Sequence, residues 1–357
     1  MTPDKALVAM SGGVDSAVSL LLSTRRYGCE AVAGLTLALA EPGTPGAITD
    51  GNNIRDAAAV CDAIGTEHRF LCAHEAFAAS VIDYFTSEYL AGRTPNPCVV
   101  CNRTVKFGLL ADYAVSNGFT RLVTGHYARL SDEGGIRWIK RAVDPAQDQS
   151  YMLALLTQAE LRLADFPLGE LTKAEVRAMA EENGLPVAHR QDSQDVCFIP
   201  DGDYAAFVCR RTGFVPQPGD YVNENGDVLG QHRGALHYTI GQRRELGIAL
   251  GRRIYVTAID AAQNRVTLGA EVGLFRHTVR LSGLHCPSDP TALDGEFRCE
   301  AKIRYAHRAA AASFRRTGDD EGELTFDEGQ RAPTPGQFAV LYDGDTVLGA
   351  GVIESAR

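Results

Sequence analysis

Six residues near the start of the chain, Ser11-Gly12-Gly13-Val14-Asp15-Ser16, constrain its fold more than any other feature. They follow a short apolar run at 5–10 that reads as a buried strand, and they precede a helical pattern over 17–26. Two glycines let the backbone approach a phosphate closely, and serine hydroxyls and the free amides of a helix N-terminus can donate to its oxygens. Asp15 offers the carboxylate oxygen that Mg²⁺ prefers. The motif therefore predicts a phosphate-binding turn between a strand and a helix.

Strand-like and helix-like segments alternate over the first 200 residues or so. The alternation predicts an α/β fold with a doubly wound parallel sheet, which binds ligands beyond the carboxyl ends of its strands. We expect residues 41–52, which are rich in Gly and Pro, to form a mobile surface loop. The expected further strands are 31–39, 68–73 and 121–124, and the expected further helices are 53–64, 76–90, 106–117 and 171–183.

The alternation of strand-like and helix-like segments ends at about residue 205. Turn signals there separate short segments, and from about residue 275 short strand-like runs alternate with Gly- and Asp-rich turns. Such runs are typical of a small antiparallel β-barrel. We expect an N-terminal α/β domain at 1–204, a small central domain at 205–273 and a C-terminal β-barrel domain at 274–357.

The formal charge of −10 argues against a general nucleic-acid binder, whose affinity comes from neutralising phosphates. A local basic face is still compatible with this charge, although a run of charges is often only a solvated surface. No run of about 18 apolar residues predicts a membrane span, and no secretory signal is visible, so we expect a cytoplasmic location. Two basic clusters occur, one of Arg233, Arg243, Arg244, Arg252 and Arg253, the other of Arg298, Lys302, Arg304, Arg308, Arg315 and Arg316.

Three of the nine cysteines stand out by their surroundings. Cys98 and Cys101 follow a proline-rigid turn and come just before a predicted helix, where thiolates are favoured, with Arg103 and Lys106 nearby. Cys197 lies in the polar stretch 192–200, which could line a cleft. By contrast, Cys29, Cys61 and Cys72 fall in apolar stretches typical of buried structural cysteines.

Two other nucleotide motifs are missing from the sequence. The dipeptide Gly-Lys, which the GxxxxGK[ST] phosphate loop requires, does not occur, and Gly-x-Gly-x-x-Gly does not follow the first strand. The Ser11–Ser16 motif instead resembles the PP-loop of the ATP pyrophosphatases, enzymes that cleave ATP between its α and β phosphates and leave AMP on a substrate oxygen.

Further motifs extend the resemblance nearly end to end to one family, the bacterial tRNA-specific 2-thiouridylases. Several are weak alone, but their order and spacing are specific. They are Ala91-Gly92-Arg93-Thr94-Pro95-Asn96-Pro97, Thr124-Gly125-His126-Tyr127, Asp148-Gln149-Ser150-Tyr151, Phe166-Pro167-Leu168-Gly169, Cys197-Phe198-Ile199 and Tyr238-Thr239-Ile240-Gly241-Gln242-Arg243.

The resemblance implies a role for each matching position. Cys197 would carry a persulfide delivered by a sulfur-donor protein, and Cys101 would be its partner nucleophile. The triplet Asn96-Pro97-Cys98 would touch the target base, and the basic clusters would face the tRNA. On this resemblance 1–204 would be the PP-loop catalytic domain and 205–273 a tRNA-binding domain. The residues implied in binding ATP are Ala9, Met10, Ser11, Gly12, Gly13, Val14, Asp15, Ser16, Leu37 and Gly125, with Asp15 also a ligand for Mg²⁺. Those implied in binding tRNA are His126, Gln147, Asp148, Gln149, Arg304, Tyr305 and Gln337.

Cys98 departs from the best-known pattern of the family, because many relatives have an aspartate there that is thought to act in acid–base steps. A thiol with a usual pKa of about 8.5 is a different acid–base group. Cys98, Cys101 and Cys197 also resemble the cysteine set of iron–sulfur-dependent tRNA thiolases, in which three thiolates would hold a [4Fe–4S] cluster. Both routes, a plain persulfide and a cluster, are open from the sequence, and a zinc site would need a fourth ligand such as His126.

The reaction implied by the resemblance begins with a wobble uridine flipped out of its anticodon loop. Its C2 oxygen would attack the α-phosphate of ATP, and sulfur from Cys197 would then displace AMP to give 2-thiouridine. A Cys101–Cys197 disulfide would remain, so the two residues must lie close in the fold. The alternatives are another PP-loop enzyme, such as an amide ligase or an argininosuccinate synthase-like protein, a tRNA-binding protein with a vestigial nucleotide site, and a zinc-stapled module.

Overall fold

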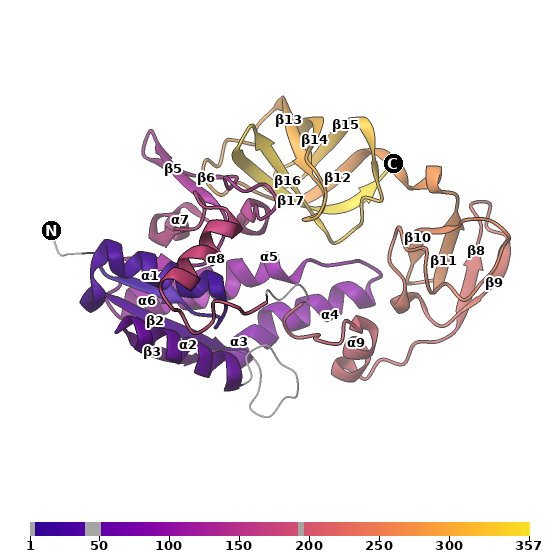
Figure 1. Ribbon diagram of the computed structural model, residues 1–357. Coiled ribbons are helices and arrows are strands. Elements are labelled where there is room, and N and C mark those ends of the chain that lie inside the picture. The colour runs from indigo at the N-terminus through magenta and orange to yellow at the C-terminus, as the bar shows by residue number, and fades with distance from the viewer. Residues whose placement is uncertain (1–3, 40–50, 192–195) are drawn as a thin grey trace.

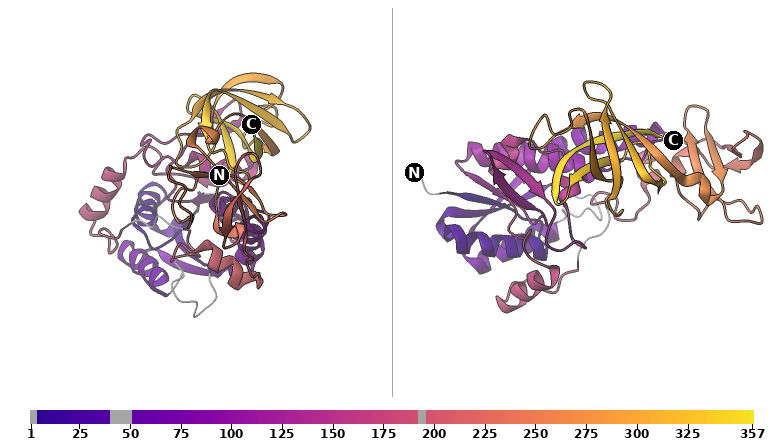
Figure 2. Two further views of the ribbon diagram at one scale, coloured as in Figure 1. Left: turned by 90° about the vertical axis from the view of Figure 1, so that its right-hand side faces the viewer. Right: turned by 90° about the horizontal axis from the view of Figure 1, so that it is seen from above.

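A computed structural model describes residues 4–39, 51–191 and 196–357 of the chain. Three sheets build it: a parallel sheet near the N-terminus, a small sheet in the middle of the sequence and a barrel at the C-terminus. Figures 1 and 2 show that the barrel lies between the other two along the long dimension of the molecule.

The first sheet has the strand order β3-β2-β1-β4-β7, and all its pairs are parallel. Alternate residues of its central strand face opposite sides, as the period of two in a strand requires. Ala6 and Val8 pack with one hydrophobic cluster and Leu7 with another. The strands are β1 (Ala6–Ala9), β2 (Val32–Ala38), β3 (Glu67–Cys72), β4 (Arg121–Val123) and β7 (Ala164–Asp165).

Helices cover both faces of this sheet, which confirms the doubly wound α/β prediction. On one face lie α1 (Val14–Tyr27), α2 (Gly51–Ile64) and α8 (Lys173–Glu182), whose buried residues join the cluster of Val8. On the other lie α6 (Leu110–Ser116) and α7 (Gln158–Leu163), which join the cluster of Leu7.

Two helical stretches are longer than the sequence predicted, and each contains a π-helical segment. One runs through α3 (His74–Phe77), the π-helix Ala78–Ile82 and α4 (Asp83–Leu90). The other runs through α5 (Pro97–Cys101), the π-helix Asn102–Leu109 and α6. The predicted start at residue 106 was wrong because Asn96 caps the helix and Pro97 occupies its first position, which proline tolerates well. Cys98 and Cys101 therefore lie on the helix.

The C-terminal domain is a closed antiparallel barrel, as predicted. Its strands follow the order β12-β15-β14-β13-β16-β17, and β17 pairs back with β12. Phe314, Leu324, Leu341 and Ile353 are among the side chains that fill it. The strands are β12 (Phe275–His285), β13 (Glu296–Lys302), β14 (Ala310–Arg316), β15 (Gly322–Arg331), β16 (Phe338–Asp343) and β17 (Thr346–Ala356).

A hairpin of the first domain, β5 (Arg129–Glu133) and β6 (Ile136–Lys140), extends the barrel sheet, a junction that the sequence did not predict. Lys140 lies opposite Thr346 of β17. Nearby, Arg129 donates to Asp345 at 2.8 Å. A second link is Arg93, whose guanidinium pairs with Glu88 of α4 and with Glu354 of β17. These are two of the contacts that fix the barrel against the first domain.

Between these two parts of the sequence lies a four-stranded sheet of order β10-β11-β8-β9. Helix α9 (Tyr204–Thr212) precedes it and packs against α4 through a stacked pair of rings, Tyr89 and Tyr204, whose centroids are 4.4 Å apart. The strands are β8 (Gly219–Val222), β9 (Val228–His232), β10 (Tyr255–Asp260) and β11 (Arg265–Gly269).

Some expectations from the sequence are wrong, and others concern residues outside the described ranges. Cys61 is buried as expected, but Cys29 and Cys72 are exposed because one lies in the turn after α1 and the other ends β3. The expected loop 41–52 lies outside the described residues except for its last two positions, which begin α2. Residues 192–195 of the polar stretch before Cys197 also lie outside them. Within the described residues, no helix is long and apolar enough to cross a membrane.

Candidate functional site

A cavity of about 370 Å³ opens beyond the carboxyl ends of β1, β2 and β4, where parallel α/β sheets bind their ligands. Residues far apart in the sequence meet on its walls. The predicted ATP-binding residues that line the cavity are Ala9, Met10, Ser11, Asp15, Ser16, Leu37 and Gly125. The predicted base- and tRNA-contacting residues that line it are Pro97, Cys98, His126 and Gln149. Both predicted catalytic cysteines, Cys101 and Cys197, also lie on its walls.

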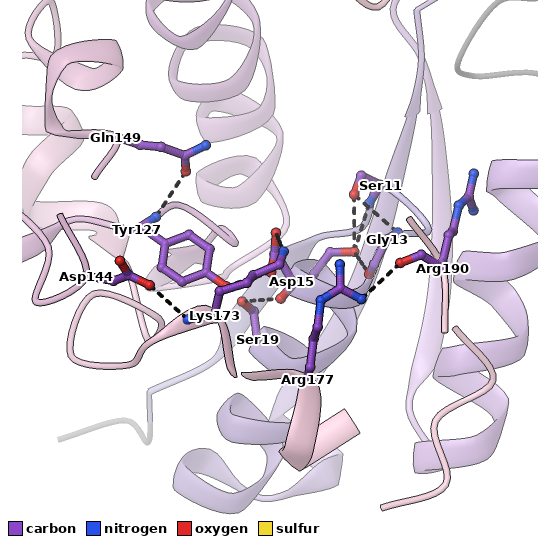
Figure 3. A network of polar contacts seen from close by, with 11 residues as sticks. Ser11, Gly13, Asp15, Ser19, Tyr127, Asp144, Gln149, Lys173, Arg177 and Arg190 are labelled. Carbon is purple, nitrogen blue, oxygen red and sulfur yellow. Dashed lines mark hydrogen bonds and ion pairs between the residues drawn. The ribbon is translucent and has the colours of Figure 1, made fainter. Parts of the chain in front are cut away.

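The phosphate-binding turn requires glycine at position 12, both for its backbone conformation and for a close contact with α2. Gly12 has φ +75°, and a Cβ there would lie 2.6 Å from the carbonyl oxygen of Asn53. The hydroxyl of Ser16 donates to the Gly13 carbonyl at 2.9 Å and holds the turn closed. No side chain caps the start of α1, so the helix dipole and its first amides are available to an anion. Figure 3 shows this turn.

Asp15 lies in the first turn of α1, and two residues from elsewhere in the sequence contact its carboxylate (Figure 3). The hydroxyl of Tyr127 donates to Oδ1 at 2.8 Å. The ammonium of Lys173 lies 2.8 Å from Oδ1 and 2.9 Å from Oδ2. The sequence did not single out Lys173, because only the three-dimensional structure brings α8 to the start of α1.

A second residue missed by the sequence, Arg190, fastens the turn to α2. Its guanidinium donates to the carbonyl of Gly12 at 2.8 Å and contacts the side chains of Asn53 and Asp56. Arg177 of α8 in turn donates to the carbonyl of Arg190 at 3.3 Å (Figure 3). The phosphate-binding turn is therefore held from the segment that leads toward Cys197.

The predicted base-contacting triplet forms the start of α5. The side-chain oxygen of Asn96 accepts from the amides of Cys98 and Val99 at 3.2 and 3.4 Å, an N-cap that fixes the turn. Gln337 of the barrel donates to the carbonyls of Thr94 and Pro95 at 2.7 and 3.1 Å. Of the triplet, Pro97 and Cys98 line the cavity, whereas Asn96 is buried behind them.

Cys98, Cys101 and Cys197 line one cavity, and each lies close enough to Lys106 for its ammonium to affect the thiol pKa. Burial raises the pKa of Cys101 to about 11 and that of Cys197 to about 12, and Lys106 opposes both shifts. Although Cys98 is accessible from the cavity, protein surrounds it and burial raises its pKa too. The expectation of favoured thiolates is therefore wrong for the ligand-free structure, since burial outweighs Lys106, and Arg103 pairs with Glu160 instead.

His126 is buried on the cavity wall, where a ring nitrogen lies 2.7 Å from the Thr124 hydroxyl. Burial, with a smaller effect of Lys106, holds its pKa well below the usual value, so the ring is neutral. The side chain of Gln149 accepts from the amide of Tyr127 at 3.0 Å, between the cavity and the Asp15 network.

Besides Asn96, the cavity lining lacks three residues of the predicted ATP set, Gly12, Gly13 and Val14, and five of the predicted tRNA set, Gln147, Asp148, Arg304, Tyr305 and Gln337. Gly12 and Gly13 belong to the turn at its edge, and Val14 is buried beneath it. Asp148 is buried, and its carboxylate accepts from the amides of Ala142 and Ser150, each at 3.1 Å.

Arg304 and Tyr305 lie at the junction between the barrel and the rest of the chain. Arg304 donates to the Ala332 carbonyl at 3.1 Å and to that of Ile240 at 3.4 Å, and it contacts Thr334. The ring of Tyr305 lies under the Lys302 ammonium, 5.2 Å from its centroid. Both side chains, like Gln337, are engaged within the chain.

The two basic clusters differ. In the second, Arg298 pairs with Asp327, Arg315 with Glu323 and Arg316 with Asp294. In the first, all five arginines are exposed, and no ion pair joins them to the described residues. Lys302, Arg304 and Arg308 of the second cluster also form no ion pair with the described residues, but Lys302 and Arg304 are partly buried and only Arg308 is exposed. The first cluster, on the small central sheet and the loops around it, thus offers the more exposed unneutralised positive charge.

No metal site is formed by the residues the structure describes: no group of three or more His, Cys, Asp or Glu side chains is arranged to hold an ion. Cys98, Cys101 and Cys197 share a cavity but do not make such a group, so the chain in this conformation does not fit a [4Fe–4S] cluster. All nine cysteines are described, and all are free thiols.

Three family models match consecutive parts of the chain. They are described as a tRNA methyl transferase HUP domain at residues 4–201, a tRNA methyl transferase PRC-barrel domain at 205–270 and an aminomethyltransferase beta-barrel domain at 276–353. Together they cover nearly the whole sequence, in the order of the three sheets.

Curated relatives match from end to end. The tRNA-specific 2-thiouridylase MnmA of Acidithiobacillus ferrooxidans is 44% identical over 100% of both chains. That of Treponema denticola is 42% identical over 99% of this chain and 98% of the relative.

Among solved structures, the U34-tRNA thiolase NcsA from Methanococcus maripaludis with its [4Fe-4S] cluster is similar at 17% identity and a TM-score of 0.36. The match covers 58% of this chain and 66% of that one. A likeness this distant does not support a functional inference. The full-length identities to the curated relatives do, and they show that the chain belongs to the tRNA-specific 2-thiouridylase family.

Proposed function

We propose that the chain is an ATP-dependent tRNA sulfurtransferase that converts the wobble uridine of a tRNA to 2-thiouridine, with AMP and pyrophosphate as the other products. One observation carries the proposal: a single cavity brings the phosphate-binding turn together with Cys98 and with Cys101 and Cys197, which are 96 positions apart in the sequence. A simple amide ligase or a nucleotide-binding module needs no cysteine pair beside its ATP site.

ATP would lie with its adenosine between Met10, Leu37 and Gly125 and its phosphates at the turn, where the amides of α1 stabilise the departing pyrophosphate. Asp15 fits a Mg²⁺ ligand because its carboxylate lies beside those amides and is partly exposed. The ion would neutralise phosphate charge when bound. The C2 oxygen of the uridine attacks the α-phosphorus, and the bond to pyrophosphate breaks.

Sulfur transfer would use the two cysteines without a metal. The terminal sulfur of a persulfide on Cys197 attacks C2, and AMP leaves with the C2 oxygen. The thiolate of Cys101 then attacks Sγ of Cys197, which leaves the transferred sulfur on the base and joins the two cysteines in a disulfide. Two thiols are oxidised as the persulfide sulfur is reduced, so a thiol reductant must restore the enzyme. Burial raises the pKa of Cys101 to about 11, so only a small fraction of this thiol is ionised at neutral pH in the ligand-free protein.

We assign the contacts with the base to Pro97 and Cys98, which the Asn96 cap holds in place, and the more distant tRNA contacts to the five exposed arginines of the first cluster. This assignment is supported by the absence of ion pairs between those arginines and the described residues. The domain limits at 204 and 273 and the cytoplasmic location, where tRNA is modified, belong to the same proposal. So does the delivery of sulfur by a persulfide-bearing protein.

The test separates the two half-reactions. Cys101→Ser and Cys197→Ser should each retain tRNA-dependent exchange of pyrophosphate into ATP and lose formation of 2-thiouridine. Cys209→Ser, at a half-buried free cysteine on α9 outside the cavity, is the matched control and should thiolate normally. Thiolation that survives in both cavity variants would refute the assignment of these cysteines.

A further inference from the structure

Lys173 lies at an unusual place for a cation. It is the first residue of α8, where the positive end of the helix dipole disfavours an ammonium group. Its backbone is nevertheless firmly placed. Thr172 and Glu175 form a reciprocal capping box, and the amide of Lys173 donates to Asp144 at 3.1 Å. The helix start is therefore fixed, and the side chain extends away from it to the start of α1.

The ammonium bridges both oxygens of Asp15, at 2.8 and 2.9 Å. It also lies 5.7 Å from the centroid of the Tyr127 ring, whose hydroxyl donates to the same carboxylate. The Lys173 side chain is only 15% exposed and that of Asp15 is 32% exposed, so the pair is shielded from bulk water but open on one side. In Figure 3 the side chains of Lys173 and Tyr127 converge on Asp15 beside the phosphate-binding turn.

A carboxylate at a phosphate-binding turn repels the ligand unless a cation separates the two. In the ligand-free protein that cation is Lys173. A Mg²⁺ ion would need a carboxylate oxygen at about 2.1 Å and would meet the ammonium, which already contacts both oxygens. The two cations therefore compete for Asp15, and the displaced ammonium would be left next to the oxygens of the bound phosphates.

We propose that Lys173 is a pyrophosphate-binding residue that Asp15 holds ready: when MgATP binds, the ammonium passes from the Asp15 carboxylate to a phosphate oxygen, and the carboxylate becomes a ligand of the metal. This inference rests on the proposed function, because it assigns ATP to the turn. It adds α8 to the elements that form the ATP site. The inference predicts two opposite changes in affinity. Loss of the ammonium should weaken the binding of MgATP and strengthen the binding of a metal ion in the absence of nucleotide.

The experiment measures both affinities in Lys173→Met. Isothermal titration with MgATP should show binding weakened about ten- to a hundredfold, the contribution of a hydrogen bond between two charged groups. Electron paramagnetic resonance with Mn²⁺ in the absence of nucleotide should show binding tightened about tenfold. Adding Asp15→Asn to Lys173→Met should abolish the gain for Mn²⁺. Lys5→Met, an exposed lysine before β1, is the matched control and should change neither affinity.

Each result decides between the accounts. MgATP affinity equal to wild type in Lys173→Met would overturn the inference and leave the proposed function standing. Weakened MgATP without tighter Mn²⁺ would overturn the exchange of cations at Asp15. A wild-type protein that binds no MgATP would refute the proposed function itself. If Lys173→Met does not fold, Lys173→Gln keeps one donor for Asp15 and carries the same predictions.

Discussion

Replacing Gly12 by alanine should damage the fold of the phosphate-binding turn, whereas replacing Gly13 should not. At Gly12, with φ +75°, alanine costs about 1 kcal/mol in backbone strain. Its Cβ would also lie 2.6 Å from the Asn53 carbonyl oxygen, and relieving such an overlap costs about 1–3 kcal/mol. That oxygen belongs to the backbone of α2, and Arg190 binds both Asn53 and Gly12, so neither side can yield easily. We expect a total loss of about 2–4 kcal/mol.

Gly13→Ala is the matched control. Gly13 has φ −99°, which alanine adopts without strain, and its added Cβ would meet only the Ser11 hydroxyl, at 3.5 Å. Its free energy of unfolding should lie within about 0.5 kcal/mol of wild type. Both variants should lose affinity for MgATP, because each places a methyl group on the turn that the phosphates approach.

The assay is urea unfolding followed by circular dichroism, with the fluorescence of the single tryptophan, Trp138 on β6, as a second probe at the barrel junction. The two glycine variants are compared under identical conditions. A Gly12→Ala protein as stable as Gly13→Ala would refute the reasoning from the close contact with Asn53.

Three further predictions follow from the surroundings of the cavity. Gln337→Ala should lower the free energy of unfolding by about 1–3 kcal/mol, because the carbonyls of Thr94 and Pro95 lose their donor. Trp138 fluorescence during urea unfolding measures this loss, and a free energy of unfolding equal to that of wild type would contradict the prediction. The pKa values of about 11 for Cys101 and about 12 for Cys197 predict that the rate of their alkylation by iodoacetamide in the ligand-free protein rises about tenfold per pH unit between about pH 8 and 10. Mass spectrometry follows the reaction, and an alkylation rate that stops rising within this pH range would contradict the prediction. His126 has a lowered pKa in the fold, so only the unfolded chain takes up its proton, and stability should fall as pH drops through about 6.5; His126→Gln should show less of this dependence in urea unfolding.

The sequence predicted the α/β class, the barrel and the phosphate-binding turn because each depends on a local pattern. The alternation of strands and helices predicts the parallel sheet, and the motif Ser11–Ser16 predicts the turn between β1 and α1. The sequence did not predict the start of α5, although its signals are local: Asn96 is the cap and Pro97 the first residue. Two prolines within Thr94-Pro95-Asn96-Pro97 are also typical of a loop.

Lys173 and Arg190 could not be predicted, since their functional contacts join segments more than 130 positions apart. Nor could the raised pKa values of the cysteines. From the sequence, a helix start and nearby cations favour thiolates, but the folded cavity surrounds the thiols with Phe77, Val81 and Val105, and desolvation outweighs Lys106.

The pairing of β5 and β6 with the barrel likewise depends on residues about 200 positions apart in the sequence. Arg129 and Lys140 meet Asp345 and Thr346, and nothing in either segment alone indicates a partner. This junction places Gln337 against the turn that precedes Cys98.

The most direct test of the central claim is anaerobic incubation of the purified protein with unmodified tRNA, MgATP and a persulfide donor, followed by mass spectrometry of the nucleosides. Iron is determined in the same sample. The account predicts 2-thiouridine that requires ATP, appears in step with AMP and pyrophosphate, and forms in iron-free protein. Thiolation only in protein that carries stoichiometric iron would contradict the metal-free transfer through Cys101 and Cys197, and absence of 2-thiouridine under either condition would contradict the proposed activity.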